Sequence, residues 1–99
     1  MPVIFNRAQI EEALLQVDVT RAIEDGFVAY SQGKVVVPPV GELIFEDPPG
    51  ACHIKYGMIT GDDYFVIKIA SGFHGGVEGG LPPFDGLMLV FSQKTAHLE

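Results

Sequence analysis

The sequence predicts an α+β fold, with two amino-terminal helices packed on one face of a mainly antiparallel sheet of about five to six strands. Two observations predict this class. Apolar residues recur with a helical period in the first third of the chain, and the pattern becomes extended, with turn-like breaks, from residue 34 onward. The 99 residues, of which 47% are hydrophobic, suffice for one domain over residues 1–99. Because so small a domain buries little surface, we expect a partner or oligomerisation to add stability.

The first helix is expected to begin after Asn6, because Asn6 and Gln9 stand at the spacing of a capping box. An apolar stripe follows at the i, i+3, i+4 and i+7 positions of a helix: Ile10, Ala13, Leu14 and Val17. Ahead of this helix, the short apolar run at residues 3–5 is interpreted as a brief strand.

The second helix is bounded by two residues that favour helix ends. Asp18 is a suitable N-cap, and Gly33 is placed to end the helix. The apolar stripe of this helix comprises Val19, Ala22, Ile23, Phe27 and Tyr30. Gly26 interrupts it, and we interpret this glycine as a site of close helix packing.

The rest of the chain predicts strands. Five extended runs occupy residues 34–37, 42–46, 51–59, 64–71 and 87–92. Turn-forming residues at 47–50 and at 61–62 predict that the second, third and fourth runs form two hairpins. Residues 72–86 contain six glycines and a proline pair, so we expect a long loop there.

Two assumed loop lengths assign the strand residues to faces. A two-residue turn between Thr60 and Asp63 places Lys55 opposite Lys68, and a four-residue loop at 47–50 places Glu42 opposite Lys55. One face then collects Leu43, Phe45, Cys52, Ile54, Tyr56, Met58, Phe65, Ile67 and Ile69, and we expect the helices to lie on it. The other face collects Glu42, Ile44, His53, Lys55, Tyr64, Val66 and Lys68.

The row of Glu42, Lys55 and Lys68 on the second face has two interpretations. Either Glu42 neutralises Lys55 on a solvated face, in a pair worth about 0–1 kcal/mol, or the two ammonium groups hold an anion between them. The position of Lys68 favours a bound anion, because this lysine interrupts an otherwise apolar strand. Lys68 and Lys55 are therefore our candidates for binding a small carboxylate, with Glu42 and His53 beside them.

Other chemistry is not indicated by the sequence. His53, His74, His97 and Cys52 lack the paired spacing of metal ligands, and Cys52 is interpreted as a core residue. The glycine-rich segment lacks the strand and helix that flank a dinucleotide fingerprint. No general acid and base pair can be named, so we expect no catalytic residue, cofactor or metal.

The composition bounds the partners and the compartment. A formal net charge of −7, with dispersed positive residues, argues against nucleic acid and anionic membranes. The single cysteine fits a reducing compartment, and no apolar run approaches the roughly 20 residues of a membrane span. With no leader pattern at the start of the chain, we expect a soluble, cytoplasmic protein.

A series of short motifs runs in order along nearly the whole chain. They are FVAY with Gly33 at residues 27–33, the proline pair at 38–39, HIKYG at 53–57, VIKIASGF at 66–73, GLP at 80–82 and GLMLVFSQKT at 86–95. Together they resemble the amino-terminal part of the ornithine cyclodeaminase and mu-crystallin family. In that family the region is a substrate-binding and dimerisation domain, with helices on a largely antiparallel sheet, and a Rossmann domain with a nicotinamide cofactor normally follows.

The resemblance also bears on individual residues. Lys68 matches the strand lysine that contacts the substrate carboxylate, whereas Val40 and Gly41 stand where many members carry an arginine. The catalytic aspartate and the cofactor loop of the family belong to a part that has no counterpart in this chain. Ala96 also replaces the glycine that follows the matching Lys94-Thr95 pair.

Three functions follow from these observations. The first is a non-catalytic, stand-alone or truncated substrate-binding and dimerisation domain that forms a homodimer through its sheet. The second is a subunit that pairs with a separate Rossmann chain to complete an NAD(P)-dependent cyclodeaminase, imine reductase or amino acid dehydrogenase. The third is a small-ligand sensor that uses the Lys55 and Lys68 face.

Overall fold

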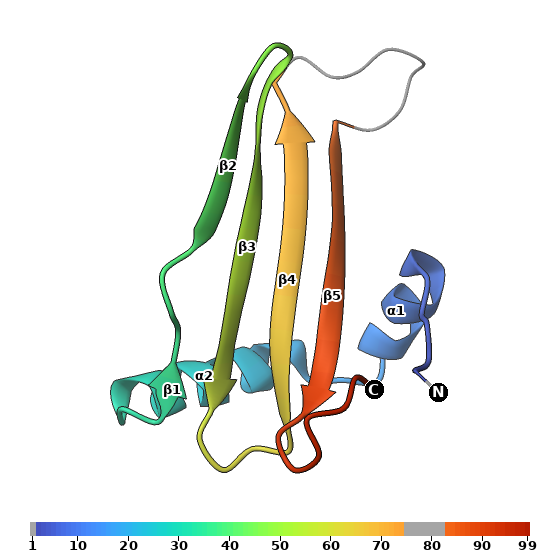
Figure 1. Cartoon of the computed structure of the whole chain (residues 1–99). Helices are drawn as coiled ribbons and strands as arrows, with labels where there is room; N and C mark the ends of the chain where they lie inside the picture. The colour runs from blue at the N-terminus through green and yellow to red at the C-terminus, as the bar shows by residue number, and fades with distance from the viewer. Residues whose placement is uncertain (1, 75–82) are drawn as a thin grey trace.

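The structure is a computed structural model that describes residues 2–74 and 83–99, and it has the predicted α+β class. Two helices precede five strands (Figure 1). The helices are α1 (Arg7–Leu14) and α2 (Val19–Ser31), and the strands are β1 (Val35–Val36), β2 (Gly41–Glu46), β3 (Pro49–Ile59), β4 (Tyr64–Phe73) and β5 (Phe84–Ser92). Much of the segment expected as a long loop, residues 72–86, lies outside the described residues, and β4 and β5 extend into both of its ends.

Both helices begin at the predicted caps. Asn6 Oδ1 accepts a hydrogen bond from Gln9 N at 2.9 Å, and Asn6 N donates to Gln9 Oε1 at 2.8 Å, which completes the capping box. Asp18 Oδ1 accepts from Arg21 N at 3.0 Å, and Gly33 follows α2 with a φ of +74°. The interpretation of Gly26 is wrong, because a Cβ at this position would meet nothing within 4 Å.

All strand pairs are antiparallel. The order is β1-β3-β4-β5, and β2 also pairs with β3. The brief strand expected at residues 3–5 is not formed, since within the described part of the chain this segment makes a single bond to a neighbour, from Val3 N to Glu99 O at 2.9 Å. One hydrogen bond is too little for a ladder, although it holds the segment beside Glu99.

The predicted register is right for one hairpin and wrong for the other. Lys55 pairs with Lys68, and Ile54 with Ile69, as expected. Between β2 and β3, however, Glu42 pairs with His53 and not with Lys55, because the strands are joined by a two-residue turn at Asp47 and Pro48. Because this register differs from the expected one by two residues, every side chain keeps its predicted face.

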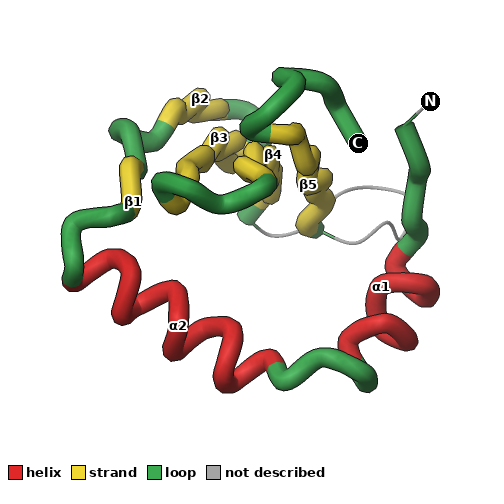
Figure 2. Tube along the Cα trace, turned by 90° about the horizontal axis from the view of Figure 1, so that it is seen from below, coloured by secondary structure: helices red, strands yellow, loops and turns green. Residues whose placement is uncertain are grey.

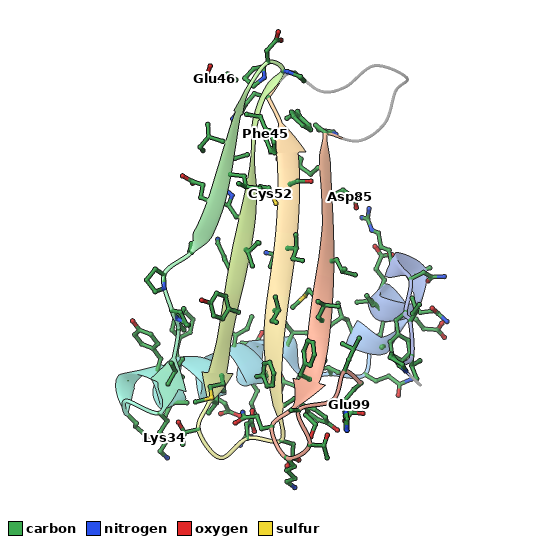
Figure 3. The ribbon with its side chains drawn as sticks, viewed as in Figure 1. Lys34, Phe45, Glu46, Cys52, Asp85 and Glu99 are labelled. Atoms are coloured by element: carbon green, nitrogen blue, oxygen red, sulfur yellow. The ribbon has the colours of Figure 1, made fainter. Side chains whose placement is uncertain are left out.

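The two faces of the sheet differ in chemistry, and we call them the apolar face and the lysine face. The apolar face comprises Leu43, Phe45, Cys52, Ile54, Tyr56, Met58, Phe65, Ile67 and Ile69, and the ladder with β5 adds Leu87, Leu89 and Phe91. The lysine face carries Glu42, Ile44, His53, Lys55, Tyr64, Val66 and Lys68, with Met88 and Val90 from β5. Phe45 and Cys52 mark the upper half of the sheet in Figure 3.

The helices do not cover the apolar face. In Figure 1, α2 passes behind the lower ends of the strands, and Figure 2 shows the two helices forming an arc on one side of the sheet. The groove between α2 and the sheet is lined by Val35 and Ile59, which pair with each other and belong to the side of Lys55. The expectation that the helices lie on the apolar face is therefore wrong in this detail.

The described residues contain no buried apolar core. Only Gly50 and Ser92 are buried among them, and neither helix buries a residue. The chain exposes 8293 Å², about 2,800 Å² more than the roughly 5,500 Å² expected of a folded monomer of this mass. Its radius of gyration, 16.1 Å, exceeds the value of about 13 Å typical of a 100-residue domain. A single chain thus leaves much of its apolar surface in contact with water.

Candidate ligand-binding face

The two candidate lysines lie side by side on the lysine face. Lys55 of β3 and Lys68 of β4 are direct ladder partners, and both are exposed. Within residues 2–74 and 83–99, neither lysine has a carboxylate within ion-pair distance. Like charges directly opposite each other destabilise an antiparallel pair, so an anion placed between the two ammonium groups would relieve a real repulsion.

Glu42 does not neutralise Lys55, because it is engaged with a different residue. Its Oε2 lies 2.7 Å from His53 Nε2, in a pair whose side chains are 52% and 40% exposed. The ladder between β2 and β3 ends at the pair of Gly41 and Ile54, so Lys55 lies beyond the paired part of β2. In the observed β2–β3 register, Lys55 therefore lacks the neutralising Glu42 that one interpretation of the sequence gave it.

Small residues adjoin the lysines across the sheet. His53 pairs with Ala70, which pairs with Gly86 on β5, so the row next to the lysines has little side-chain bulk on β4 and β5. In the lysine row itself, Lys68 pairs with Met88. This arrangement can accommodate a small group that carries one carboxylate and an apolar part, with Lys55 and Lys68 as the charged contacts.

The remaining candidates do not join this site. Cys52 is half-buried on the apolar face, where it pairs with Leu43 and Ser71. His74 and His97 are exposed and lie outside the strands that carry the lysines. In the part of the chain that the structure describes, no three His, Cys, Asp or Glu side chains group as metal ligands, and neither helix could span a membrane.

One feature without a predictive signal in the sequence is the Gln93 clamp. The Gln93 side chain donates hydrogen bonds to Ile59 O at 3.0 Å and to Tyr64 O at 2.9 Å, and its backbone N donates to Asp63 O. Lys94 Nζ adds an ion pair to Asp63 at 3.0 Å. These contacts tie the end of β5 to the β3–β4 turn, and so fix the strands that carry Lys55 and Lys68.

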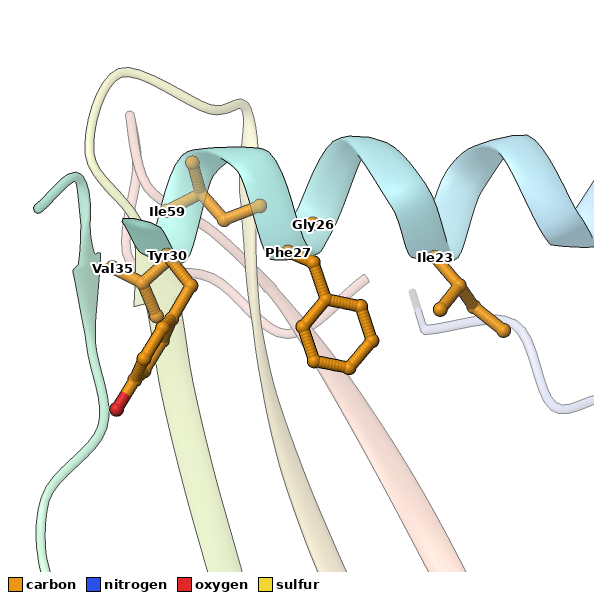
Figure 4. Close-up of a pocket in the computed structure, with 6 residues that line it drawn as sticks. All are labelled: Ile23, Gly26, Phe27, Tyr30, Val35 and Ile59. Carbon is orange, nitrogen blue, oxygen red and sulfur yellow. The ribbon is translucent and has the colours of Figure 1, made fainter. Parts of the chain in front are cut away.

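A second such feature is the groove beneath α2. It has a volume of about 380 Å³ and is lined by Ile23, Gly26, Phe27, Tyr30, Val35 and Ile59 (Figure 4). Three residues of the predicted apolar stripe of α2, Ile23, Phe27 and Tyr30, line this groove, so the stripe was a signal for it. The sequence does not indicate which face of the sheet α2 packs against, because both faces carry apolar residues near Ile59.

Two curated proteins match most of the chain. One is named "Putative dehydrogenase RB0419", from Rhizobium meliloti (strain 1021), and is 33% identical over 82 residues, 83% of this chain and 25% of the relative. The other is named "Uncharacterized cyclodeaminase y4tK", from Sinorhizobium fredii (strain NBRC 101917 / NGR234), and is 34% identical over 86 residues, 86% of this chain and 26% of the relative.

No family model matches the chain, and no solved structure does. The chain spans about a quarter of the length of the two curated relatives. The names of these relatives, a dehydrogenase and a cyclodeaminase, support the resemblance to the ornithine cyclodeaminase family that the motifs along the chain indicate.

Proposed function

We propose that this chain is a substrate-binding and dimerisation domain of the ornithine cyclodeaminase type, without catalytic activity of its own, acting in the cytoplasm. It forms a homodimer through the apolar face of its sheet and binds a small, amino acid-like carboxylate through Lys55 and Lys68. The observation that carries the proposal is the uncovered apolar face, which the helices leave open on the opposite side of the sheet from the lysines.

The exposed area supports the homodimer. Six residues of the apolar face, Leu43, Phe45, Ile54, Tyr56, Met58 and Leu87, are between 37% and 59% exposed. A stable homodimer removes roughly 1,000–2,500 Å² from each partner, which is within the surface that this chain exposes in excess of a folded monomer. Two copies that join their apolar faces would create the core that a single copy lacks.

The lysine pair supports the ligand. Two adjacent ammonium groups without a carboxylate partner among the described residues match the two oxygens of one carboxylate. Met88 and the small residues Ala70 and Gly86 beside them suit a short apolar substituent. Because the lysine face points away from the proposed dimer interface, the ligand and the second copy would not compete for the same surface.

The test has two arms. Sedimentation equilibrium of the full chain should give a mass of about 21 kDa, twice the 10.7 kDa of one chain, and a monomer at high concentration would refute the homodimer. Calorimetry with a panel of amino and keto acids should give binding heat that Lys68→Ala abolishes and Lys34→Ala retains. Heat of equal size with Lys68→Ala would refute the site.

A second candidate is favoured by the length of the relatives. Since the chain spans about a quarter of each, a separately encoded Rossmann chain would complete an NAD(P)-dependent enzyme of the cyclodeaminase, imine reductase or amino acid dehydrogenase type. The open groove beneath α2 provides an apolar surface for such a chain. Reduction or oxidation of a nicotinamide cofactor only after the two chains are mixed would favour this candidate over the first.

A further inference from the structure

Residues 3–5 form an apolar segment that is exposed in the single chain. Val3 and Phe5 are each 63% exposed, and Ile4 is 88% exposed. A run of consecutive exposed apolar residues is unusual on the surface of a soluble protein unless another molecule covers it. The segment is nevertheless held in place, because Val3 N donates a hydrogen bond to Glu99 O at 2.9 Å.

This anchor connects the segment to the apolar face of the sheet. Leu98 forms a bridge with Phe91 of that face, and Glu99 N donates to Val90 O at 2.9 Å. Residues 98–99 therefore extend the sheet beyond the edge of β5, and Val3 lies beside them. Figure 3 shows Glu99 at the lower end of β5, and Figure 2 shows the C-terminus between that strand and the N-terminal segment. The apolar surface thus continues from Phe91 to Leu98, and the backbone of Val3 is anchored beside it.

We propose that residues 3–5 form a clasp that contacts the second copy of this chain in the homodimer, an inference that rests on the proposed function. The exposed area points to the second copy as the occupant. A stable homodimer covers roughly 1,000–2,500 Å² of each partner, whereas this chain exposes about 2,800 Å² more than a folded monomer of its mass. An interface in that range leaves part of the excess uncovered. Because Val3 is anchored beside Glu99, at the edge of the apolar face, the segment lies where a second copy placed on that face can cover it.

The chain provides a matched pair of variants. Ile4 is 88% exposed and Leu15, at the C-cap of α1, is 85% exposed, so replacing either by serine costs little in the single chain. Ile4→Ser should weaken the dimer at least about tenfold, because each dimer loses two buried apolar side chains. Leu15→Ser should leave the dissociation constant within about twofold of wild type, as measured by sedimentation equilibrium over a dilution series.

The outcomes separate the clasp from the dimer. A wild-type dimer with Ile4→Ser no weaker than Leu15→Ser would overturn the clasp and leave the proposed homodimer intact, whereas a monomeric wild type would overturn both. As an independent measurement, a photo-crosslinker such as p-benzoylphenylalanine can replace Ile4 in a mixture of ¹⁴N- and ¹⁵N-labelled chains. Crosslinked peptides of mixed label support the clasp, and peptides of a single label only would refute it.

Discussion

The two faces of the sheet are built from the same strands, yet they differ in what they leave unsatisfied. The apolar face exposes large hydrophobic side chains on the side without helices, and the lysine face exposes two like charges without a carboxylate partner among the described residues. Contact with another apolar surface would remove the exposed hydrophobic side chains from water, and a bound anion would offset the repulsion between the two lysines. The proposed second copy and the proposed carboxylate would therefore use opposite faces of the sheet and would not compete.

The largest effect should come from a charge on the apolar face. Leu87 and Met88 are neighbours with similar exposure, 57% and 62%, but Leu87 pairs with Ile69 on the apolar face and Met88 with Lys68 on the lysine face. Leu87→Asp should weaken the proposed homodimer at least about 100-fold, since an unpaired buried charge costs about 3–5 kcal/mol. Met88→Asp should leave the dissociation constant nearly unchanged, and equal effects of the two variants in sedimentation equilibrium would contradict the assignment of the faces.

The next largest effect should come from a change in the packing of β3 against β4, the two central strands that contribute to both faces. A Cβ added at Gly50 would collide with the carbonyl oxygen of Gly72 and lie 3.0 Å from the Cα of Phe73, so backbone atoms of β4 would have to move. Gly50→Ala should lower the free energy of unfolding in urea by about 1–3 kcal/mol. The control is Gly26→Ala in α2, where the new methyl meets nothing and should raise stability by about 0.5–1 kcal/mol. Stabilisation by Gly50→Ala would show that the strands are farther apart at this pair.

A charge reversal on the lysine face should have a smaller effect, of opposite sign. Lys68→Glu converts the pair with Lys55 from like to opposite charge, which should stabilise the ligand-free protein by about 0.2–1 kcal/mol. For a domain of this size that is roughly 1–8 °C in the thermal midpoint, measured by calorimetry. The same variant should lose any thermal protection by carboxylates. Lys34→Glu, with the same change in net charge, should do neither, and a lower midpoint for Lys68→Glu would argue against repulsion between the lysines.

The elements that depend on local chemistry were predictable from the sequence. Asn6 with Gln9, and Asp18, define helix starts by their own hydrogen bonds, and alternation along a strand fixes which side chains share a face. The pair of Lys55 and Lys68 followed from the short turn before Tyr64. These features need no knowledge of distant parts of the chain.

The features that depend on distant contacts were not predictable. In the β2–β3 hairpin, turn-forming residues at 47–50 do not show how many of them enter the strands, and this decides whether Glu42 meets Lys55 or His53. The bonds from Gln93 to Ile59 and Tyr64 join residues about 30 positions apart, and no spacing rule indicates them. The face of the sheet on which α2 lies depends on tertiary packing against Ile59. The amphipathic stripe of α2 does not determine that face.

The smallest effect concerns the charge of Glu42, which stands next to the lysines along the sheet. His53 and Lys55 are two residues apart on β3, so Glu42, opposite His53, lies roughly 7 Å along the strand from Lys55. Glu42→Gln keeps an oxygen that can accept a hydrogen bond from His53 and removes a negative charge that repels an incoming carboxylate. Because water screens exposed charges at this distance to about 0.5 kcal/mol, carboxylate affinity in calorimetry should rise about twofold, with almost no change in stability. Weaker binding by more than about fivefold would instead mean that the Glu42 carboxylate positions a group of the ligand itself, and the lysine face would then bind both ends of a zwitterion.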